Sequence, residues 1–264
     1  MHPFVNTAVK AARRAGSIIV RHLDRLDRID IEKKGHNDYV SEVDHKAETE
    51  ILAIIQQAYP DHAIVAEESG QQPGTRYEWI IDPLDGTTNF LHGYPQFAVS
   101  IAVREAGRIT HGVIFDPLRN ELFTASRGGG ARLNDRRIRI SHCQNLEYAL
   151  LGTGFPFRDM LYLEPWLSSF REMLIQTSGI RRAGSAALDL AHLACGRFDG
   201  FWEFGLSIWD IAAGCLLIEE AGGLISGPSG SVDHLDSGHI VAGNPYLHPQ
   251  ILEIIRNHLP EDFH

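Results

Sequence analysis

The sequence predicts a mixed fold of the α+β or α/β class, and three observations carry this prediction. A helical apolar pattern opens the chain, three β-patterned segments follow between Phe97 and Ser126, and strand-like and helix-like segments alternate after about residue 145. Consecutive β segments joined by short turns are typical of an antiparallel meander, whereas alternation is typical of βα units. We therefore expect an N-terminal lobe, residues 1–145, and a C-terminal lobe, residues 146–264, packed as one unit.

Two helices are expected before the first strands. Apolar residues recur near helical spacing over residues 5–26 and again over residues 47–58. Ser41 and Asp44 stand at capping-box spacing before the second stripe, and Pro60 marks its end. The opening stretch lacks acids and contains arginine, which is also typical of a mitochondrial transit peptide. The apolar spacing favours an ordinary first helix of the fold.

The remaining elements follow the same rules. Strand-like runs at residues 63–69 and 77–83 precede the meander, whose segments end at turn-like sequences. The glycine-rich stretch at 126–137 lacks the spacing of a Walker phosphate loop. The C-terminal half predicts strands and helices in alternation, at residues 148–154, 162–176, 179–184, 185–195, 198–203, 209–221, 239–244 and 248–259.

Composition limits the classes of partner. A chain of 264 residues with 44% hydrophobic content can bury a sizeable core. Its formal charge of −10 argues against binding to nucleic acid or an anionic membrane, because such binding depends on excess lysine and arginine. A small-molecule partner is therefore expected.

The cysteines and the apolar runs predict a cytoplasmic protein. The three cysteines lie far apart and form no CxxC pair, so reduced thiols are expected rather than disulfides or a zinc cluster: Cys143, Cys195 and Cys215. No apolar run approaches the roughly 20 residues of a membrane-spanning helix, and no signal-peptide pattern opens the chain.

The segment Trp79–Phe90, "WIIDPLDGTTNF", carries the strongest chemical signal. If the strand ends at Asp82, a turn can aim Asp82 and Asp85 at one point. Two carboxylates held that close are unfavourable unless a cation lies between them, and oxygen ligands of this kind suit Mg²⁺ or Mn²⁺. An Asp-Pro turn in which Asp82 caps backbone amides is the alternative.

Further acids end or begin other elements. Glu67 and Glu68 end an apolar strand, and Asp210 begins a helix directly after Trp209. Each has a simpler explanation, as a solvated strand end or as a partner of the helix dipole. Since open α/β folds gather functional groups at the ends of their elements, one crevice could hold the whole set: Glu67, Asp82, Asp85 and Asp210.

These segments together resemble the signatures of the inositol monophosphatase family, whose members are magnesium-dependent, lithium-sensitive sugar-phosphate phosphatases. "WIIDPLDGTTNF" is followed about 120 residues later by "WDIAAGCLLIEEAGG", and the resemblance runs from "DYVSEVD" through "AEES" to "VAGN". In detail the chain is most similar to SuhB-type bacterial members. The resemblance implies a layered αβαβα sandwich of the inositol monophosphatase and fructose-1,6-bisphosphatase type, and a homodimer.

The resemblance also implies roles for individual residues. Two or three metal ions would be held by Glu67, Asp82, the Leu84 carbonyl, Asp85 and Asp210. Thr87, with Asp44 behind it, would orient the attacking water, and Glu67 would assist catalysis. Phosphate and sugar hydroxyls would contact Asp85, Gly86, Thr87, Ser185, Ala186, Glu203 and Asp210, although Glu203 could instead be an exposed strand residue. Lys34, or Lys33 in its place, would lie in a mobile loop over the metals.

The function implied is hydrolysis of myo-inositol 1-phosphate and related monoesters by metal-activated water, with Mg²⁺ or Mn²⁺ as cofactor and Li⁺ and Ca²⁺ as inhibitors. Fructose-1,6-bisphosphatase, nucleotide 3′-phosphatase and histidinol-phosphatase activities are the alternatives. SuhB-type relatives also imply a regulatory contact with RNA polymerase or Nus factors. No serine, cysteine or histidine nucleophile is required, and the 14 histidines show no paired ligand spacing.

Overall fold

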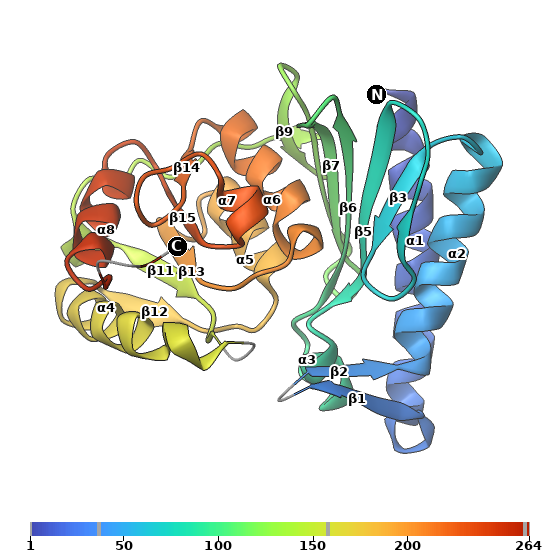
Figure 1. Ribbon diagram of the computed structural model, residues 1–264, viewed down its shortest axis with the longest axis horizontal. Coiled ribbons are helices and arrows are strands. Elements are labelled where there is room, and N and C mark those ends of the chain that lie inside the picture. Colours follow the sequence, from blue (N-terminus) through green and yellow to red (C-terminus); the bar gives the residue numbers. More distant parts are fainter. Residues whose placement is uncertain (1, 36–37, 157–158, 261–262, 264) are drawn as a thin grey trace.

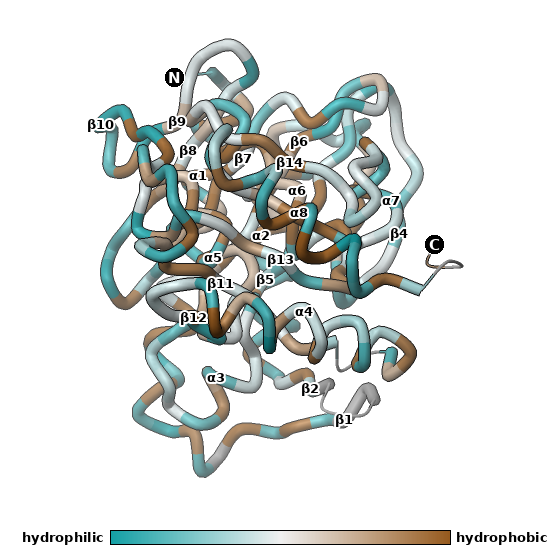
Figure 2. The backbone as a smooth tube through the Cα atoms, turned by 90° about the vertical axis from the view of Figure 1, so that its left-hand side faces the viewer, coloured by the Kyte–Doolittle hydropathy of each residue, from teal (hydrophilic) through white to brown (hydrophobic). Residues whose placement is uncertain are grey.

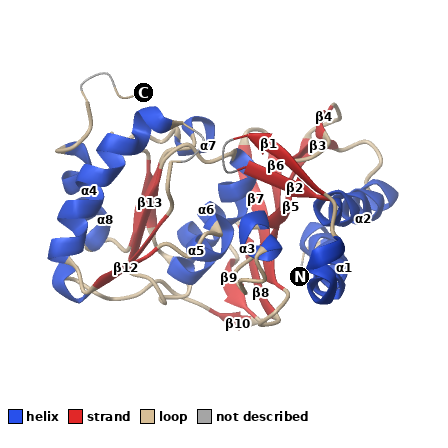
Figure 3. Cartoon of the chain, turned by 90° about the horizontal axis from the view of Figure 1, so that it is seen from below, coloured by secondary structure: helices blue, strands red, loops and turns tan. Residues whose placement is uncertain are grey.

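Helices and sheets alternate in layers in the computed structural model, which describes residues 2–35, 38–156, 159–260 and 263 (Figure 1). Helices α1 and α2 cover one face of an eight-stranded sheet, and α6 packs on its other face. Beyond α5 and α6 lies a five-stranded sheet, whose far side is covered by α4 and α8 (Figure 3). The predicted αβαβα order is therefore confirmed.

The first layer forms as the apolar spacing predicts. Helix α1 (Pro3–His22) begins after His2, whose ring nitrogen accepts a hydrogen bond from the Phe4 amide at 3.2 Å. Its buried face is rich in alanine, which lets the helix lie close to α2 (Glu42–Ala58) and to the sheet. The capping box at the start of α2 is present as predicted. A 3₁₀ segment, η1 (Leu23–Arg28), follows α1.

The eight-stranded sheet has the order β10-β9-β8-β7-β6-β5-β3-β4. The predicted antiparallel meander is its centre, and β3 and β5 are the one parallel pair in the described part of this sheet. Its strands are β3 (Ala63–Ala66), β4 (Gly70–Gln72), β5 (Tyr77–Asp85), β6 (Ala98–Glu105), β7 (Arg108–Asp116), β8 (Glu121–Ser126), β9 (Gly130–Leu133) and β10 (Arg136–Arg137). Helix α3 (Thr87–Leu91) follows β5.

A two-stranded antiparallel hairpin, β1 (Ile31–Gly35) and β2 (Asp38–Ser41), was not predicted as regular structure. Its sequence is charged and lacks the apolar alternation that signals a strand. The hairpin leads directly into the N-cap of α2.

The middle layer consists of α5 (Ala186–Ala194), α6 (Ile208–Ala221) and the short α7 (His234–Ser237). Nearly every residue of α5 and α6 is buried, as expected of helices enclosed between two sheets. Figure 2 shows apolar stretches along α6. Each fully buried Leu or Ile contributes about 1.5–3 kcal/mol relative to exposure, so these helices join the two sheets firmly.

The second sheet has the order β12-β11-β13-β15-β14 and is mixed. It contains β11 (Leu150–Thr153), β12 (Gly179–Arg181), β13 (Gly200–Glu203), β14 (Leu224–Ser226) and β15 (Ile240–Gly243). Helices α4 (Leu163–Gln176) and α8 (Leu247–Arg256) form the outer layer, and η2 (Leu146–Tyr148) and η3 (Met160–Tyr162) precede β11 and α4.

No helix in the described ranges is both long and apolar enough to cross a membrane. The division into lobes at residue 145 stays a prediction. Helix α6, from the C-terminal half, packs on β6 and β7 of the N-terminal half, which gives the two halves a common core.

Candidate functional site

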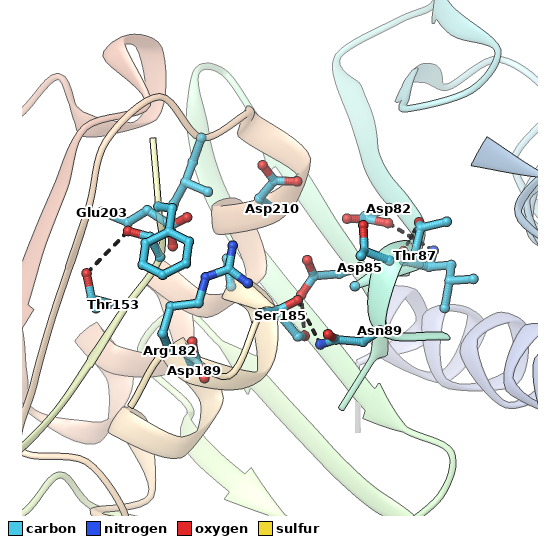
Figure 4. Close-up of a pocket in the computed structure, with 18 of the residues that line it drawn as sticks. Asp82, Asp85, Thr87, Asn89, Thr153, Arg182, Ser185, Asp189, Glu203 and Asp210 are labelled. Carbon is cyan, nitrogen blue, oxygen red and sulfur yellow. Dashed lines mark hydrogen bonds between the residues drawn. The ribbon is translucent and has the colours of Figure 1, made fainter. Parts of the chain in front are cut away.

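A pocket of about 300 Å³ lies where the end of β5, helix α3 and the start of α5 meet (Figure 4). It draws side chains from both halves of the chain. Every residue that the sequence suggested as a metal ligand or substrate contact lines it: Glu67, Asp82, Leu84, Asp85, Gly86, Thr87, Ser185, Ala186, Glu203 and Asp210.

The two aspartates of β5 reach the pocket through an irregularity in strand pairing. The prediction that the strand ends at Asp82 was wrong, because β5 continues to Asp85. Asp82 pairs with Ser100 and Asp85 pairs with Ala98. Between these two pairs β5 advances by three residues and β6 by two, so β5 contains one extra residue, a β-bulge. Side chains alternate between the faces of a regular strand, and the extra residue turns both carboxylates towards one point.

Hydrogen bonds fix the orientation of both carboxylates. Asp82 Oδ1 accepts from the Leu84 amide at 2.9 Å. Asp85 Oδ2 accepts from the Ser185 hydroxyl and from the Ala187 amide, the latter at 2.8 Å, which attaches the end of β5 to the start of α5.

Asp210 completes a cluster of three carboxylates. It occupies the N3 position of α6, where Oδ2 accepts from the Ser207 amide at 2.8 Å in a capping box. Asp82, Asp85 and Asp210 each offer an oxygen such that all three oxygens lie within 4.8 Å of one another. The predicted helix-dipole role and a ligand role are thus compatible for Asp210.

The electrostatics of the cluster favour a bound cation. Asp82 is 1% exposed, and burial, together with the charges of Glu67, Asp85 and Asp210, raises its pKa well above the usual range. An ionised Asp82 is costly there unless a positive charge offsets it. Carboxylate and carbonyl oxygens are the ligands that Mg²⁺ prefers, so the residues present fit a magnesium site.

Glu67 and Leu84 lie beside this cluster. Glu67 follows β3, its amide donates to the Ile81 carbonyl at 3.1 Å, and its side chain lines the pocket outside the three-carboxylate group. The Thr87 hydroxyl oxygen lies 3.0 Å from the Leu84 carbonyl oxygen and 2.9 Å from Asp44 Oδ1, so these two acceptors share its single hydrogen. A carbonyl oxygen has two lone pairs, so it can hold a second partner as well.

Thr87 and Asp44 form a hydrogen-bonded pair at the edge of the cluster. The Thr87 hydroxyl donates a hydrogen bond to Asp44 Oδ1, at 2.9 Å. The other oxygen of this carboxylate, Oδ2, accepts from the Ser41 amide at 2.8 Å. Asp44 therefore caps α2 and contacts Thr87 at once. Burial raises the pKa of Asp44, although the hydrogen bonds from Ser41 and Thr87 oppose this shift.

Gly86 separates Asp85 from Thr87 and has φ of +97°, a left-handed conformation that side chains disfavour. A Cβ there would come within 2.9 Å of the Gln96 carbonyl. The backbone can thus turn sharply from β5 into α3 beside the carboxylates.

The opposite side of the pocket is formed by the start of α5 and the end of β13. Ser185 caps α5, and Ala186 is its first residue. Glu203 is 6% exposed, so its alternative as an exposed strand residue was wrong. A Cβ on Gly154 would overlap the Glu203 carboxylate, which shows how closely that group lies against the backbone just after β11.

Sequence reasoning missed several lining residues, among them three with polar side chains on the pocket: Asn89, Arg182 and Asp189. The Asn89 amide donates to the carbonyls of Gln96, Ala183 and Gly184 at 2.8, 2.9 and 3.1 Å, which joins α3 to the segment before α5. The Arg182 guanidinium lies 4.4 Å from the Phe155 ring centre. Asn89 follows the recognised "DGTT" directly, whereas the other two carry no local signal.

Lys34 falls within β1, and the side chains of Lys33 and Lys34 lie outside the described part of the chain. Their predicted position over the metals stays a prediction.

Comparison with known proteins shows the family to which the chain belongs. Residues 1–259 match the model of the inositol monophosphatase family. The chain is 56% identical over 266 residues to the Nus factor SuhB of Pseudomonas aeruginosa, covering 98% of each chain. It is 48% identical over 263 residues to the Nus factor SuhB of Escherichia coli K12, covering 99% of this chain and 98% of the relative.

Solved structures of related proteins have the same fold as this chain. The extragenic suppressor protein suhB of Bartonella henselae superimposes with a TM-score of 0.95 at 43% identity, over 98% of this chain and all of that one. The inositol monophosphatase of Anabaena superimposes with a TM-score of 0.87 at 39% identity, over 98% of this chain and 97% of that one.

Proposed function

Because this chain belongs to the inositol monophosphatase family, we propose that it is a Mg²⁺-dependent phosphatase that hydrolyses myo-inositol 1-phosphate and related sugar or polyol phosphate monoesters. One observation carries the proposal. The three clustered carboxylates stand next to the Thr87–Asp44 pair, so a cation site and a water-orienting group adjoin one pocket.

The metals would be held by Glu67, Asp82, Asp85, Asp210 and the Leu84 carbonyl. When bound, Mg²⁺ supplies charge neutralisation for the phosphoryl oxygens and lowers the pKa of a water molecule. Mn²⁺ is expected to substitute for it, and Li⁺ and Ca²⁺ to inhibit. The raised pKa of Asp82 supports this assignment, because only a positive charge removes the cost of ionising all of these acids together.

Thr87 and Asp44 orient the attacking water in this mechanism. With its hydrogen donated to Asp44 Oδ1, the Thr87 oxygen presents a lone pair that accepts a hydrogen from water. The oxygen of that water is then directed at phosphorus, and its proton can pass through Thr87 Oγ1 to the Asp44 carboxylate. Burial suits Asp44 to this role, because it raises the pKa of the group that receives the proton.

The remaining lining residues bind the substrate. The amides of Gly86 and Thr87 are assigned to the phosphate, because the turn at Gly86 permits a close approach of the backbone. Asp85, Ser185, Ala186, Glu203 and Asp210 are assigned to the polyol hydroxyls. The water oxygen forms a new P–O bond as the P–O bond to the polyol oxygen breaks. The leaving polyol oxygen takes a proton from solvent water, and the products are the alcohol and inorganic phosphate.

The substrate is tested by phosphate release from four compounds assayed side by side at saturating Mg²⁺. We expect kcat/KM to be highest for myo-inositol 1-phosphate, ahead of fructose 1,6-bisphosphate, adenosine 3′,5′-bisphosphate and histidinol phosphate. A preference for one of the other three compounds would replace the proposed substrate, and the absence of phosphate release from all four would contradict the proposed function.

We also propose a homodimer. Exposed apolar side chains gather towards the end of α4, where Leu174 is 53% and Ile175 is 79% exposed. A second copy of the chain would cover them. Sedimentation at micromolar concentration is expected to give twice the chain mass of 29.4 kDa. Ile175→Asp should shift the protein towards monomer, whereas Val232→Asp, at a 91% exposed position outside α4, should not. A wild-type monomer would contradict the dimer.

A regulatory role is proposed in addition to catalysis, because relatives of this chain are named Nus factors. The partner would be RNA polymerase or a Nus factor in the cytoplasm, and the three free cysteines agree with a reducing compartment. Co-purification of tagged wild-type protein and of Asp82→Asn with these factors tests the role. Equal recovery would support an activity-independent contact, and absence of the factors from both samples would contradict it.

A further inference from the structure

We propose that Asp189 is a substrate-binding residue that exchanges a hydrogen bond with a ring hydroxyl of the polyol, beside Glu203. This inference rests on the proposed phosphatase function and adds a specificity-determining residue to it. The family resemblance assigns no role to Asp189.

The position of Asp189 relative to the carboxylate cluster is fixed by α5. Its amide donates to the Ser185 carbonyl at 3.0 Å, one helical turn earlier. Ser185 is itself hydrogen-bonded to Asp85. Asp189 lines the pocket on the side that carries Arg182 and Glu203, across from Asp82 and Thr87 (Figure 4). A monoester with its phosphate at the cluster would therefore extend its ring towards Asp189.

One oxygen of the buried Asp189 carboxyl group lacks a hydrogen-bond partner. The residue is 1% exposed, and its Oδ1 has no hydrogen-bond partner within the ranges that the structure describes. Buried carboxyl groups in folded proteins are normally hydrogen-bonded, and an unpaired one is destabilising. Because the residue also lines the pocket, a ligand hydroxyl that reaches this carboxyl group would lower the cost of its burial.

The charges around Asp189 favour a neutral hydroxyl as that partner. Burial, followed by the charges of Glu203 and Asp85, raises the pKa of Asp189 well above the usual range, against the opposing effect of Arg182. A protonated carboxyl offers one donor and one acceptor, which matches a hydroxyl group. Asp189 also lies outside the three-carboxylate cluster, so a metal-ligand role does not account for it.

The test compares two substrates in matched variants. Asp189→Leu removes both hydrogen-bonding functions at similar side-chain shape, whereas Asp189→Asn keeps a donor and an acceptor. Asp189→Ala is the second apolar variant, for use if the leucine does not fit. The control is His192→Asn, because His192 lies on the same helix, is also buried with an unpartnered nitrogen in the described ranges, and does not line the pocket.

The substrates are myo-inositol 1-phosphate and p-nitrophenyl phosphate, whose leaving group has no ring hydroxyls. Asp189→Leu or Asp189→Ala is expected to lower kcat/KM for the inositol ester about tenfold, the scale of one lost hydrogen bond, mainly through KM. In the same apolar variants, kcat/KM for the aryl ester should change less than about twofold. Asp189→Asn should keep most of the preference for the inositol ester. His192→Asn should leave the ratio of the two kcat/KM values unchanged.

Two results would overturn the inference while leaving the proposed function intact. The first is an equal loss on both substrates in the apolar variants, which indicates a packing role for Asp189. The second is unchanged kinetics on the inositol ester. A wild-type protein that releases phosphate from neither compound at saturating Mg²⁺ would instead overturn the proposed function, and the role of Asp189 with it.

Discussion

Asp82→Asn is expected to lower kcat by about 10³-fold or more at saturating Mg²⁺. Asp82 belongs to the three-carboxylate cluster, and the charges of Glu67, Asp85 and Asp210 contribute to raising its pKa. The asparagine amide removes one negative charge from the cation site and so weakens the hold on the cation. A bound cation contributes several kcal/mol to transition-state stabilisation, and each 1.36 kcal/mol lost lowers the rate about tenfold. Steady-state phosphate release and magnesium titration measure the loss.

The same substitution should not unfold the metal-free chain. The folded-state pKa of Asp82 is raised, so this carboxyl group lowers the stability of the fold above its unfolded-state pKa, and the cost disappears as the pH falls below that unfolded-state pKa. Asparagine removes this cost, and the melting temperature in a chelator should be equal to or higher than that of the wild type.

Asp116→Asn is the matched control for Asp82→Asn. Asp116 is as buried as Asp82 but holds the turn after β7, through the Leu118 and Arg119 amides, and does not line the pocket. This variant should lose stability and keep turnover. Near-normal turnover of Asp82→Asn in saturating Mg²⁺ would show that the cluster is not the metal site.

Thr87→Ala is expected to reduce kcat by about 10²-fold or more with little change in magnesium affinity, since an acid–base contribution of this kind has that size. The alanine removes the hydroxyl that bridges Asp44 and the attacking water, yet leaves the carboxylates in place. Thr87→Ser keeps the hydroxyl and should recover much of the rate. Phosphate release at saturating Mg²⁺ distinguishes the three proteins.

Thr88→Ala is the control for this pair, because Thr88 follows directly in α3 and is exposed, and although it also lines the pocket it is not the residue bonded to Asp44. Wild-type activity in Thr87→Ala would remove the water-orienting role. A larger loss at Thr88 than at Thr87 would move that role by one residue.

The cluster was predictable from the sequence because its members lie in short segments of distinctive order. "DPLDG" brings Asp82 and Asp85 together within four residues, and "WD" starts a helix with an acid. The bulge that turns both aspartates to one face was not predictable, since it depends on how β6 pairs with β5. The β1–β2 hairpin escaped prediction because its charged sequence carries no apolar alternation.

Residues whose role depends on distant contacts were harder to predict. Asn89 acts on the carbonyls of Ala183 and Gly184, more than 90 positions along the chain. The burial of Asp189 in α5 and of Glu203 at the end of β13 depends on how the helices and sheets pack, and a lone acid in a helix or strand carries no local sign of such burial. Local patterns therefore identify the metal end of the pocket better than its opposite side.

The hydrogen bond between Asp85 and Ser185 closes a loop of 100 residues. Closing so long a loop costs chain entropy that no local contact offsets, so this contact is expected to form late on the folding pathway. An ion that depends on Asp85 finds its site only in the nearly complete structure. It would therefore slow the unfolding of the finished chain and leave the rate of folding almost unchanged.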